Sequence, residues 1–304
     1  LDQWAGDRLP ALTANEHDDL DGTCKAIVKA LGGAGFTAYA VPASAGGHHT
    51  KLDVRSLCLI RETLARHNAL SDFAFAMQGL GSGPISLFGN EAQQADYLQA
   101  VATGDKIAAF ALSEPDAGSD VAGMTCRAHR DGDDWVINGE KWFASHARFS
   151  AFLLVMVVTN PDVPIHEGAS IFLVEQGTPG MEIIRNSAVG PYIEQGDGVH
   201  AYISFKDCRV PAENLLGDEG QGFHVAQTRL GGGRVHHAMR TVGVIRRAID
   251  MMCERALSRR TKGELLADKQ MSQEKIADAY TMMMQYRLHV LYTAWLIDKH
   301  KEYN

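Results

Sequence analysis

Cysteine is scarce in this sequence, and its spacing excludes most of the chemistry that cysteine supports. Five cysteines occur among 304 residues, an odd number with no C-x-x-C spacing. This pattern argues against a disulfide framework and against a thiolate zinc site. Scattered thiols are typical of a reducing compartment, so we expect the bacterial cytoplasm or, in a eukaryote, a mitochondrial or peroxisomal matrix. The cysteines are Cys24, Cys58, Cys126, Cys208 and Cys253.

Long apolar runs and an excess of positive charge are missing as well. The longest apolar run, residues 151–158, is far shorter than the roughly 20 residues that a membrane helix needs. Leu1 opens polar, charged sequence without the apolar core of a signal peptide. The 29 Lys and Arg residues are outnumbered by 37 Asp and Glu residues, whereas nucleic-acid binding needs a concentrated basic face. We therefore expect neither a membrane nor a nucleic-acid partner.

Motifs for metal ions and for nucleotide loops are absent too. The adjacent pairs His48-His49 and His236-His237 would point in different directions on a strand or helix, and they lack partners at ligand spacing. The glycine-rich stretches 32–35 and 79–83 do not follow a predicted strand, which makes a phosphate loop a poor interpretation. No metal site is predicted.

The first third of the chain has the periodicity of helices. Apolar side chains in residues 20–31 recur at helical spacing. Asp53, Ser71 and Asn90 stand where the N-caps of three further helices are expected. The sequence therefore predicts an N-terminal helical domain over residues 1–106.

Short apolar segments separated by loops rich in Pro, Gly and Asn follow. The dipeptide Asn138-Gly139 is the strongest short-range hairpin signal and predicts a type I′ turn. Several short antiparallel strands imply a barrel or a sandwich. The predicted fold class is α+β, with a middle antiparallel β-barrel domain over residues 107–214.

Helical patterns return in residues 215–304. A long candidate helix over residues 222–256 contains Gly231-Gly232-Gly233, and each glycine in a helix costs about 1 kcal/mol relative to alanine. Either a kink is tolerated there or a ligand contacts the backbone, which is the interpretation that we favour. A second long helix is predicted near the end, over residues 272–299. Because a bundle usually needs roughly four helices, we expect residues 215–304 to be the first part of an incomplete C-terminal bundle.

Two stretches could hold an anionic group. Residues 109–120, AFALSEPDAGSD, pass from an apolar strand into a rim of small and hydroxyl residues, where Pro115 ends strand pairing and Gly118 permits a turn. Residues 259–263, RRTKG, are the densest positive cluster of the chain. They are either a solvated helix end or part of a pyrophosphate site, and their spacing does not decide between these two.

Together these stretches resemble the acyl-CoA dehydrogenase family over nearly the whole chain. The resemblance implies an FAD-dependent flavoprotein of fatty acid metabolism that oxidises an acyl-CoA thioester to the 2,3-enoyl-CoA. Electron-transfer flavoprotein would take the electrons, and the enzyme would be a homodimer or homotetramer. GRVHHAMRTVG at 233–243 is most similar to the branch that in some animals is fused to a phosphotransferase-like kinase domain. The motifs are AFALSEPDAGSD at 109–120, INGEKWFAS at 137–145, CRVPAENLLG at 208–217 and SRRTKGELLADKQ at 258–270.

The resemblance also implies site residues. An aromatic ring at Phe143 would flank the flavin, the Ser145 hydroxyl would reach its N5 atom, and the stretch from Arg259 would contact FAD bound mainly by a neighbouring subunit. Lys262 stands where relatives often place an aromatic residue. The implied FAD contacts are Phe110, Leu112, Ser113, Gly118, Ser119, Phe143, Ala144, Ser145, Arg259, Arg260, Thr261, Lys269 and Gln270. The implied substrate contacts are Ser119, Gly231, Gly232, Gly233 and Arg234.

The catalytic base is the main departure from the family pattern. The reaction requires a carboxylate that takes the α-proton of the thioester. Some branches carry it at the position of Gly233, where this chain has no side chain, so the resemblance places the base beyond Asn304 and none within residues 1–304. Two alternatives stay open, namely a flavin monooxygenase or oxidase on the same scaffold and a non-catalytic scaffold that binds acyl-CoA or protein.

Overall fold

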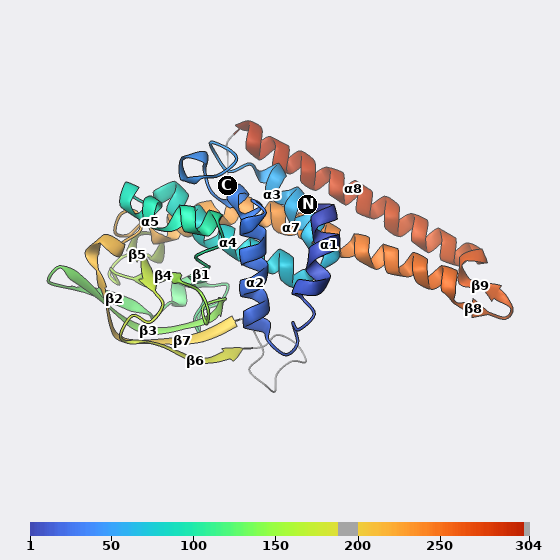
Figure 1. The fold of residues 1–304 in the computed structure, drawn as a ribbon. Helices are drawn as coiled ribbons and strands as arrows, with labels where there is room; N and C mark the ends of the chain where they lie inside the picture. Colours follow the sequence, from blue (N-terminus) through green and yellow to red (C-terminus); the bar gives the residue numbers. More distant parts are fainter. Residues whose placement is uncertain (188–199, 301–304) are drawn as a thin grey trace. The chain divides into compact units, whose positions relative to one another are not determined.

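The computed structural model describes residues 1–187 and 200–300 (Figure 1). These residues fall into two compact units. We call the larger one the β unit; it comprises Leu12–Leu52 and Ala74–Leu230. We call the other the helical unit; it comprises Leu1–Ala11, Asp53–Phe73 and Gly231–Asn304. The helices α4 (Ala69–Phe88) and α7 (Gly222–Ser258) each have residues in both units.

The main helices of the β unit begin at polar caps. In α2 (Leu20–Gly33) the Asp19 carboxylate accepts from the Gly22 N–H at 2.8 Å. In α5 (Glu91–Ala102) Asn90 and Gln93 form a capping box, so the cap predicted at Asn90 is confirmed. Shorter helical turns are η1 (Thr37–Ala40), η2 (Ala43–Ala45), η3 (Val121–Gly123), α6 (Ile165–Gly168) and η4 (Ala212–Asn214).

Among the described residues, seven strands form one sheet in the order β1-β4-β2-β3-β7-β6, with β5 also paired to β4 (Figure 1). The predicted α+β class with a middle β domain is confirmed. The pairs β2–β3, β3–β7, β6–β7 and β4–β5 are antiparallel as predicted, whereas β1 and β2 join β4 in parallel. The strands are β1 (Ala108–Ala111), β2 (Arg127–Asp131), β3 (Asp134–Ser145), β4 (Phe152–Val158), β5 (Ala169–Glu175), β6 (Met181–Ser187) and β7 (His200–Pro211).

Strand β4 lies at the centre of the β unit, because all its residues are buried. Successive side chains of a strand point to opposite faces. The even-numbered residues of β4 belong to a cluster with Ile85 of α4 and Leu98 of α5. The odd-numbered ones belong to a second cluster with Ile137 of β3 and Phe205 of β7. Burial on both faces explains why β4 is a continuous apolar run without alternation.

The type I′ hairpin predicted at Asn138-Gly139 is wrong. Both residues lie inside β3, which continues through a register shift in its pairing with β7. Gly139 has φ +135, and a Cβ there would stand 2.6 Å from the Cys126 Cα. The glycine therefore serves a bulge and a close backbone approach, and the turn between β2 and β3 falls instead at Gly132-Asp133.

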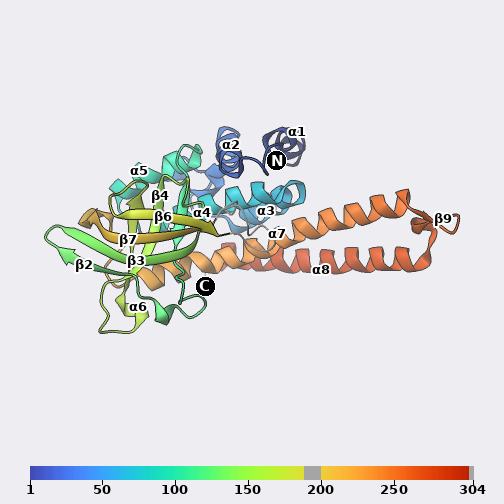
Figure 2. The ribbon, with the colours of Figure 1, turned by 90° about the horizontal axis from the view of Figure 1, so that it is seen from below.

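The helical unit contains two long antiparallel helices, α7 and α8 (Gln270–His300), joined by a small hairpin (Figure 2). The hairpin strands are β8 (Arg260–Thr261) and β9 (Glu264–Leu265), followed by η5 (Leu266–Asp268). Lys262 and Gly263 both have positive φ, +51 and +83, which is the backbone that a two-residue type I′ turn needs. Helix α7 continues without a break through the three glycines at 231–233.

Helices α1 (Asp2–Leu12) and α3 (Val54–His67) complete the helical unit. Asp53 caps α3 as predicted, since its carboxylate accepts from the Ser56 N–H at 2.7 Å. The cap predicted at Ser71 is wrong, because α4 begins at Ala69 and the Asn68 side chain accepts from the Ser71 N–H at 2.9 Å. Asn and Ser are both favoured N-caps, so composition alone could not separate these neighbours.

Buried ion pairs hold the helical unit around its apolar core. The Arg61 guanidinium donates twice to the Asp72 carboxylate, at 2.8 Å from both Nε and Nη2. Buried Glu62 accepts from Arg246 at 2.8 Å and from Arg287 at 2.9 Å, which ties α3 to α7 and α8. None of the described helices is long and apolar enough to cross a membrane.

Candidate functional site

The two stretches predicted to edge the flavin lie together in the β unit. The chain leaves β1 and turns tightly at Glu114, whose N–H donates to the Ala117 carbonyl at 2.9 Å. The Ser113 carbonyl accepts from the Trp142 N–H of β3 at 2.8 Å. This bond helps to join residues 109–120 to β3, the strand that carries residues 143–145, and we call the place where the two stretches meet the junction.

A buried ion pair, which sequence reasoning missed, fixes this junction. The Lys141 ammonium has no exposed surface and donates to Glu114 Oε1 at 2.7 Å and to the Leu112 carbonyl at 3.0 Å. Glu114 also accepts from the backbone N–H groups of Thr125 and Cys126, at 2.6 and 3.1 Å. Burial alone would raise the pKa of Glu114, but the Lys141 charge and these hydrogen bonds hold it below its usual value. The carboxylate is therefore ionised and fully engaged.

Phe143 projects from this junction. Its side chain is 48% exposed although it follows buried Lys141 on the strand, and its φ is +53. Its ring stacks on Trp142 with a centroid distance of 5.2 Å and an interplanar angle of 4°, while the Trp142 indole donates to Ser187 Oγ at 2.7 Å. Left-handed backbone at an aromatic residue costs roughly 1–3 kcal/mol and is concentrated at functional sites. The strand thus holds a large ring outward in a strained conformation.

Ser145 lies on the same strand, and a histidine faces it. Ser145 Oγ is 2.8 Å from Nδ1 of His200, its cross-strand neighbour at the start of β7. Burial lowers the pKa of His200, so its ring is neutral at pH 7. His200 was not predicted; a histidine paired in register with a predicted site residue becomes visible only when the β3–β7 pairing is known.

The next residue, His146, is fully buried with φ +64. Its ring packs against Phe149 with a centroid distance of 4.9 Å. Burial lowers the pKa of His146 from 6.5 to about 3, and repulsion from His200, when that ring is protonated, adds a smaller contribution. The imidazole is therefore neutral in the folded protein.

We expect His146→Asn to flatten the acid dependence of folding. Because the pKa of His146 is lower in the folded state than in the unfolded state, its imidazole binds a proton in the unfolded chain but not in the folded chain between pH 6.5 and about 3. The free energy of unfolding therefore decreases as the pH is lowered through this window, by about 1.4 kcal/mol per pH unit for this group. Asparagine tolerates a left-handed backbone, so urea unfolding at several pH values in this window compares the two slopes. Equal slopes in wild type and variant would contradict the assignment.

The remaining predicted site residues of the β unit belong to the same two stretches, 109–120 and 137–145. The Phe110 ring is half-buried beneath the Arg229 guanidinium, 5.4 Å from the ring centroid. Gly118 is exposed, and a Cβ there would meet nothing within 4 Å. Ser119 is exposed, and Ala144 is buried in the core behind Phe143. Residues 118–119 thus form an open rim, and Ala144 serves packing within this unit.

The other predicted residues belong to the helical unit. Gly231 to Arg234 lie on α7, and a Cβ added at Gly233 would meet only His236 Nε2, at 3.8 Å. No steric demand for glycine exists at 233 within the described residues. Arg259 and Arg260 lead into the β8–β9 hairpin and are exposed, as are Thr261 and Gln270, and Lys269 pairs with Glu264.

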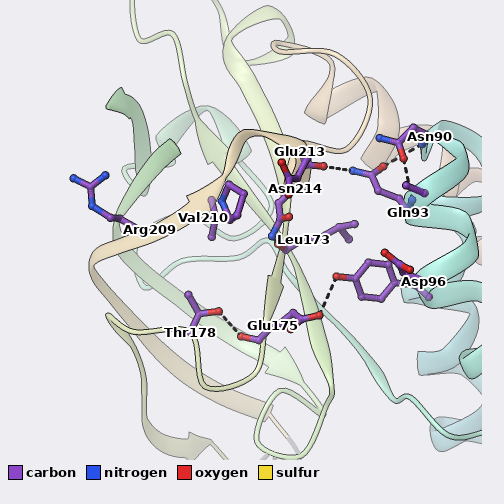
Figure 3. A pocket seen from close by; sticks show the side chains of 13 residues that line it. Asn90, Gln93, Asp96, Leu173, Glu175, Thr178, Arg209, Val210, Glu213 and Asn214 are labelled. Atoms are coloured by element: carbon purple, nitrogen blue, oxygen red, sulfur yellow. Dashed lines mark hydrogen bonds between the residues drawn. The ribbon is translucent and has the colours of Figure 1, made fainter. Parts of the chain in front are cut away.

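A separate pocket of about 470 Å³ opens in the β unit between α5 and the ends of β5 and β7 (Figure 3). The Tyr97 hydroxyl donates to Glu175 there at 3.3 Å, and the Gln93 amide donates to the Glu213 carbonyl at 2.8 Å. None of the predicted site residues lines this pocket. Several of its polar groups already form hydrogen bonds within the protein, such as Gln93 with the Leu215 carbonyl and Asn214 with the Leu173 carbonyl. The described residues also contain no cluster of side chains suited to a metal ion.

Comparisons with known proteins agree with this architecture. Family models of the N-terminal, middle and C-terminal domains of acyl-CoA dehydrogenases match residues 2–105, 109–208 and 220–303. An acyl-CoA dehydrogenase of Bacillus anthracis, solved in complex with FAD, has a TM-score of 0.86 and 30% identity, covering 98% of this chain and 50% of that one. A chain with this order of helices and sheet therefore has the fold of a flavoprotein dehydrogenase. It belongs to the acyl-CoA dehydrogenase family, as its motifs predicted.

Curated relatives point to the same family. Probable acyl-CoA dehydrogenase FadE2 of Mycobacterium tuberculosis is 40% identical over 219 residues, which are 71% of this chain and 53% of that protein. Acyl-CoA dehydrogenase family member 11 of Homo sapiens is 38% identical over 218 residues, 70% of this chain and 28% of that protein. The chain thus matches about half of the first relative and less than a third of the second.

Proposed function

We propose that this protein binds FAD and dehydrogenates the α,β bond of an acyl-CoA thioester to the 2,3-enoyl-CoA, with electron-transfer flavoprotein as electron acceptor. The observation that supports this most directly is the junction of residues 112–114 with residues 141–145. It presents an exposed aromatic ring, a backbone edge and a hydroxyl from one rigid assembly, and these are the groups that a flat isoalloxazine ring needs.

The residues present fit a flavin. Phe143 offers an apolar face in a fixed orientation, since Trp142 backs it and the strand holds its φ at +53. Leu112 and Ser113 lie on the edge of the junction, where their carbonyl oxygens accept hydrogen bonds from Lys141 and Trp142, respectively. The open rim at Gly118 and Ser119 lets a ligand approach the backbone closely.

When bound, FAD would accept a hydride from the β-carbon of the substrate. Phe143 would cover the ring and exclude water from it, and Ser145 would place its hydroxyl at the ring's edge. Lys141 and Glu114 would keep these elements in register, because pre-organised groups need no rearrangement at the moment of reaction. The α-proton needs a carboxylate, and Glu114 is unsuited to that role because its pKa is depressed and both oxygens accept hydrogen bonds.

Flavin absorbance and its bleaching test the proposal. We expect protein reconstituted with FAD to retain the flavin through gel filtration and to accept electrons from an acyl-CoA under anaerobic conditions, provided that the protein tested includes the base. A series of straight, branched and hydroxylated acyl-CoAs would identify the substrate. Oxygen consumption without electron-transfer flavoprotein would instead favour the oxidase alternative. Binding of acyl-CoA by a protein that retains no flavin would favour the non-catalytic scaffold.

Phe143→Ala gives the matched variant for this test. Burying a phenylalanine side chain against a ligand is worth about 1.5–3 kcal/mol, so the affinity for FAD should fall by roughly tenfold to a hundredfold. Leu87→Ala is the control, because Leu87 is 43% exposed in the same unit and outside the junction. An unchanged FAD dissociation constant for Phe143→Ala would argue against the junction as the flavin site.

Several parts of the proposal rest on the family resemblance. These parts are the substrate contacts at Gly231 to Arg234, the FAD contacts at residues 259–261 and 269–270, and the assembly into a homodimer or homotetramer. The proposed division into domains at 106 and 214 rests instead on the helix and strand patterns of the sequence, and the proposed cytoplasmic or matrix location rests on the scattered cysteines. Arg259→Ala, followed by flavin retention and by the oligomeric state in light scattering, separates the cofactor role from the assembly role.

A further inference from the structure

The Ser145–His200 pair is built into the pairing of β3 with β7. The two residues are direct cross-strand neighbours, and 2.8 Å separates Ser145 Oγ from His200 Nδ1. The Phe143 ring meets the same imidazole edge-on, with centroids 6.2 Å apart. The histidine therefore contacts both the hydroxyl and the aromatic ring that the proposed site presents.

A neutral imidazole can hold a serine hydroxyl in two ways. With its proton on Nδ1, His200 donates to Ser145 Oγ, and the hydroxyl proton is available to an acceptor on the other side. With its proton on Nε2, His200 accepts through Nδ1, and Oγ offers a lone pair to a donor instead. Both forms carry the same number of protons. The ring thus decides whether the hydroxyl acts outward as a donor or as an acceptor.

A flavin needs a hydrogen-bond donor and a hydrogen-bond acceptor at the same atom in turn. Its N5 accepts a hydrogen bond when the flavin is oxidised and carries a hydrogen when the flavin is reduced. A fixed partner such as a backbone carbonyl would satisfy only one of the two states. We infer that His200 is a positioning residue that sets the polarity of the Ser145 hydroxyl toward the flavin in each redox state. This inference rests on the proposed FAD function and adds to it a residue that acts through Ser145.

The surroundings of His200 favour this role over a merely structural bond. The ring is partly buried, and burial lowers its pKa, so at pH 7 it is in the neutral form, which has two tautomers. The charged state would make both ring nitrogens donors and would remove the acceptor form. His146, the residue after Ser145, is buried and neutral as well, so its imidazole adds no fixed charge.

Two variants at His200 test the inference. His200→Leu removes both hydrogen-bonding functions, whereas His200→Asn replaces the ring by an amide near the position of Nδ1 that can donate or accept. We expect His200→Leu to lower the rate of flavin reduction by about tenfold with little change in KM, as for one hydrogen bond made mainly in the transition state. The flavin midpoint potential should also shift, and His200→Asn should restore most of both. His129→Leu, an exposed histidine on β2, is the control and should match wild type.

A double-mutant cycle isolates the dependence on Ser145. In a Ser145→Ala background, His200→Leu should have almost no further effect on rate or potential, because the effect of the ring is transmitted by the hydroxyl. Additive effects, or failure of His200→Asn to restore function while it folds normally, would overturn the inference. Thermal unfolding of each variant shows whether a change comes from lost folding instead.

A measurement on the flavin-free protein separates this inference from the proposed function. ¹⁵N chemical shifts of the His200 ring report its tautomer, and they should change on Ser145→Ala even without FAD. Addition of FAD, and then of dithionite, should move the tautomer balance from Nδ1–H toward Nε2–H. If wild type retains FAD and is reduced by acyl-CoA but the balance does not move, the inference fails while the proposed function stands. If wild type retains no FAD, the proposed function fails, and so does the redox role of His200.

Discussion

Lys141→Met should destabilise the β unit more than most single substitutions. The change leaves the Glu114 carboxylate, whose side chain is 3% exposed, without its cation. Removing one partner of a buried ion pair costs about 3–5 kcal/mol, because the other charge remains desolvated. Methionine keeps most of the side-chain volume, so packing contributes little to the loss. Urea unfolding followed by circular dichroism should show an earlier transition for the β unit.

Two companion variants make this result specific. Lys206→Met replaces an exposed lysine on β7 and should leave the midpoint almost unchanged. In the double variant Lys141→Met/Glu114→Gln the uncompensated charge is gone, so part of the lost stability should return. FAD retention should follow the same order, because Lys141 also holds the Leu112 carbonyl. A Lys141→Met protein as stable as wild type would show that the pair contributes nothing.

Asp72→Asn should have an effect of similar size on the helical unit. Asp72 is 1% exposed and accepts two hydrogen bonds from Arg61, whose side chain is 5% exposed, and Arg240 lies 3.3 Å away. The amide leaves the buried Arg61 guanidinium uncompensated, and we expect a loss of about 3–5 kcal/mol for this reason. Differential scanning calorimetry should show a lower transition temperature for this unit.

Asp250→Asn is a closely matched control for that experiment. It removes the same kind of partner from Arg66, but here the two side chains are 33% and 50% exposed. An exposed pair of this kind is worth about 0–1 kcal/mol, so the transition should hardly move. If the two asparagine variants behaved alike, burial of the Arg61–Asp72 pair would not be the source of its energy.

Sequence patterns predicted the elements of this fold better than the contacts of the site. The caps at Asp53 and Asn90, the helix over residues 20–31 and the two long C-terminal helices follow from local chemistry, and the structure contains all of them. The hairpin turn predicted at Asn138-Gly139 is wrong because the long pairing of β3 with β7 outweighs the local turn preference of these two residues. The two-residue turn of type I′ backbone occurs at Lys262-Gly263, a sequence with a weaker signal.

The contacts at the junction could not be predicted from the sequence. A lysine in a strand is expected at the surface, and nothing local to Lys141 indicates that Glu114 lies beside it. The one available signal is its placement in alternation with buried Ile137 along β3. His200 was hidden for a related reason, since its role depends on a register that only the folded sheet defines.

The parallel pairing of β1 with β4 also determines when this region can form during folding. Ala108 pairs with Phe152, so the whole stretch from Leu112 to Ser145 is a loop closed by that pairing. Parallel contacts between distant residues form slowly, because the entropy of loop closure is lost before the contacts compensate for it. During synthesis the stretch cannot be enclosed until β4 has left the ribosome. The proposed cofactor-binding surface should therefore form late in folding, and β1, which stays unpaired until then, would be a target for chaperones and proteases.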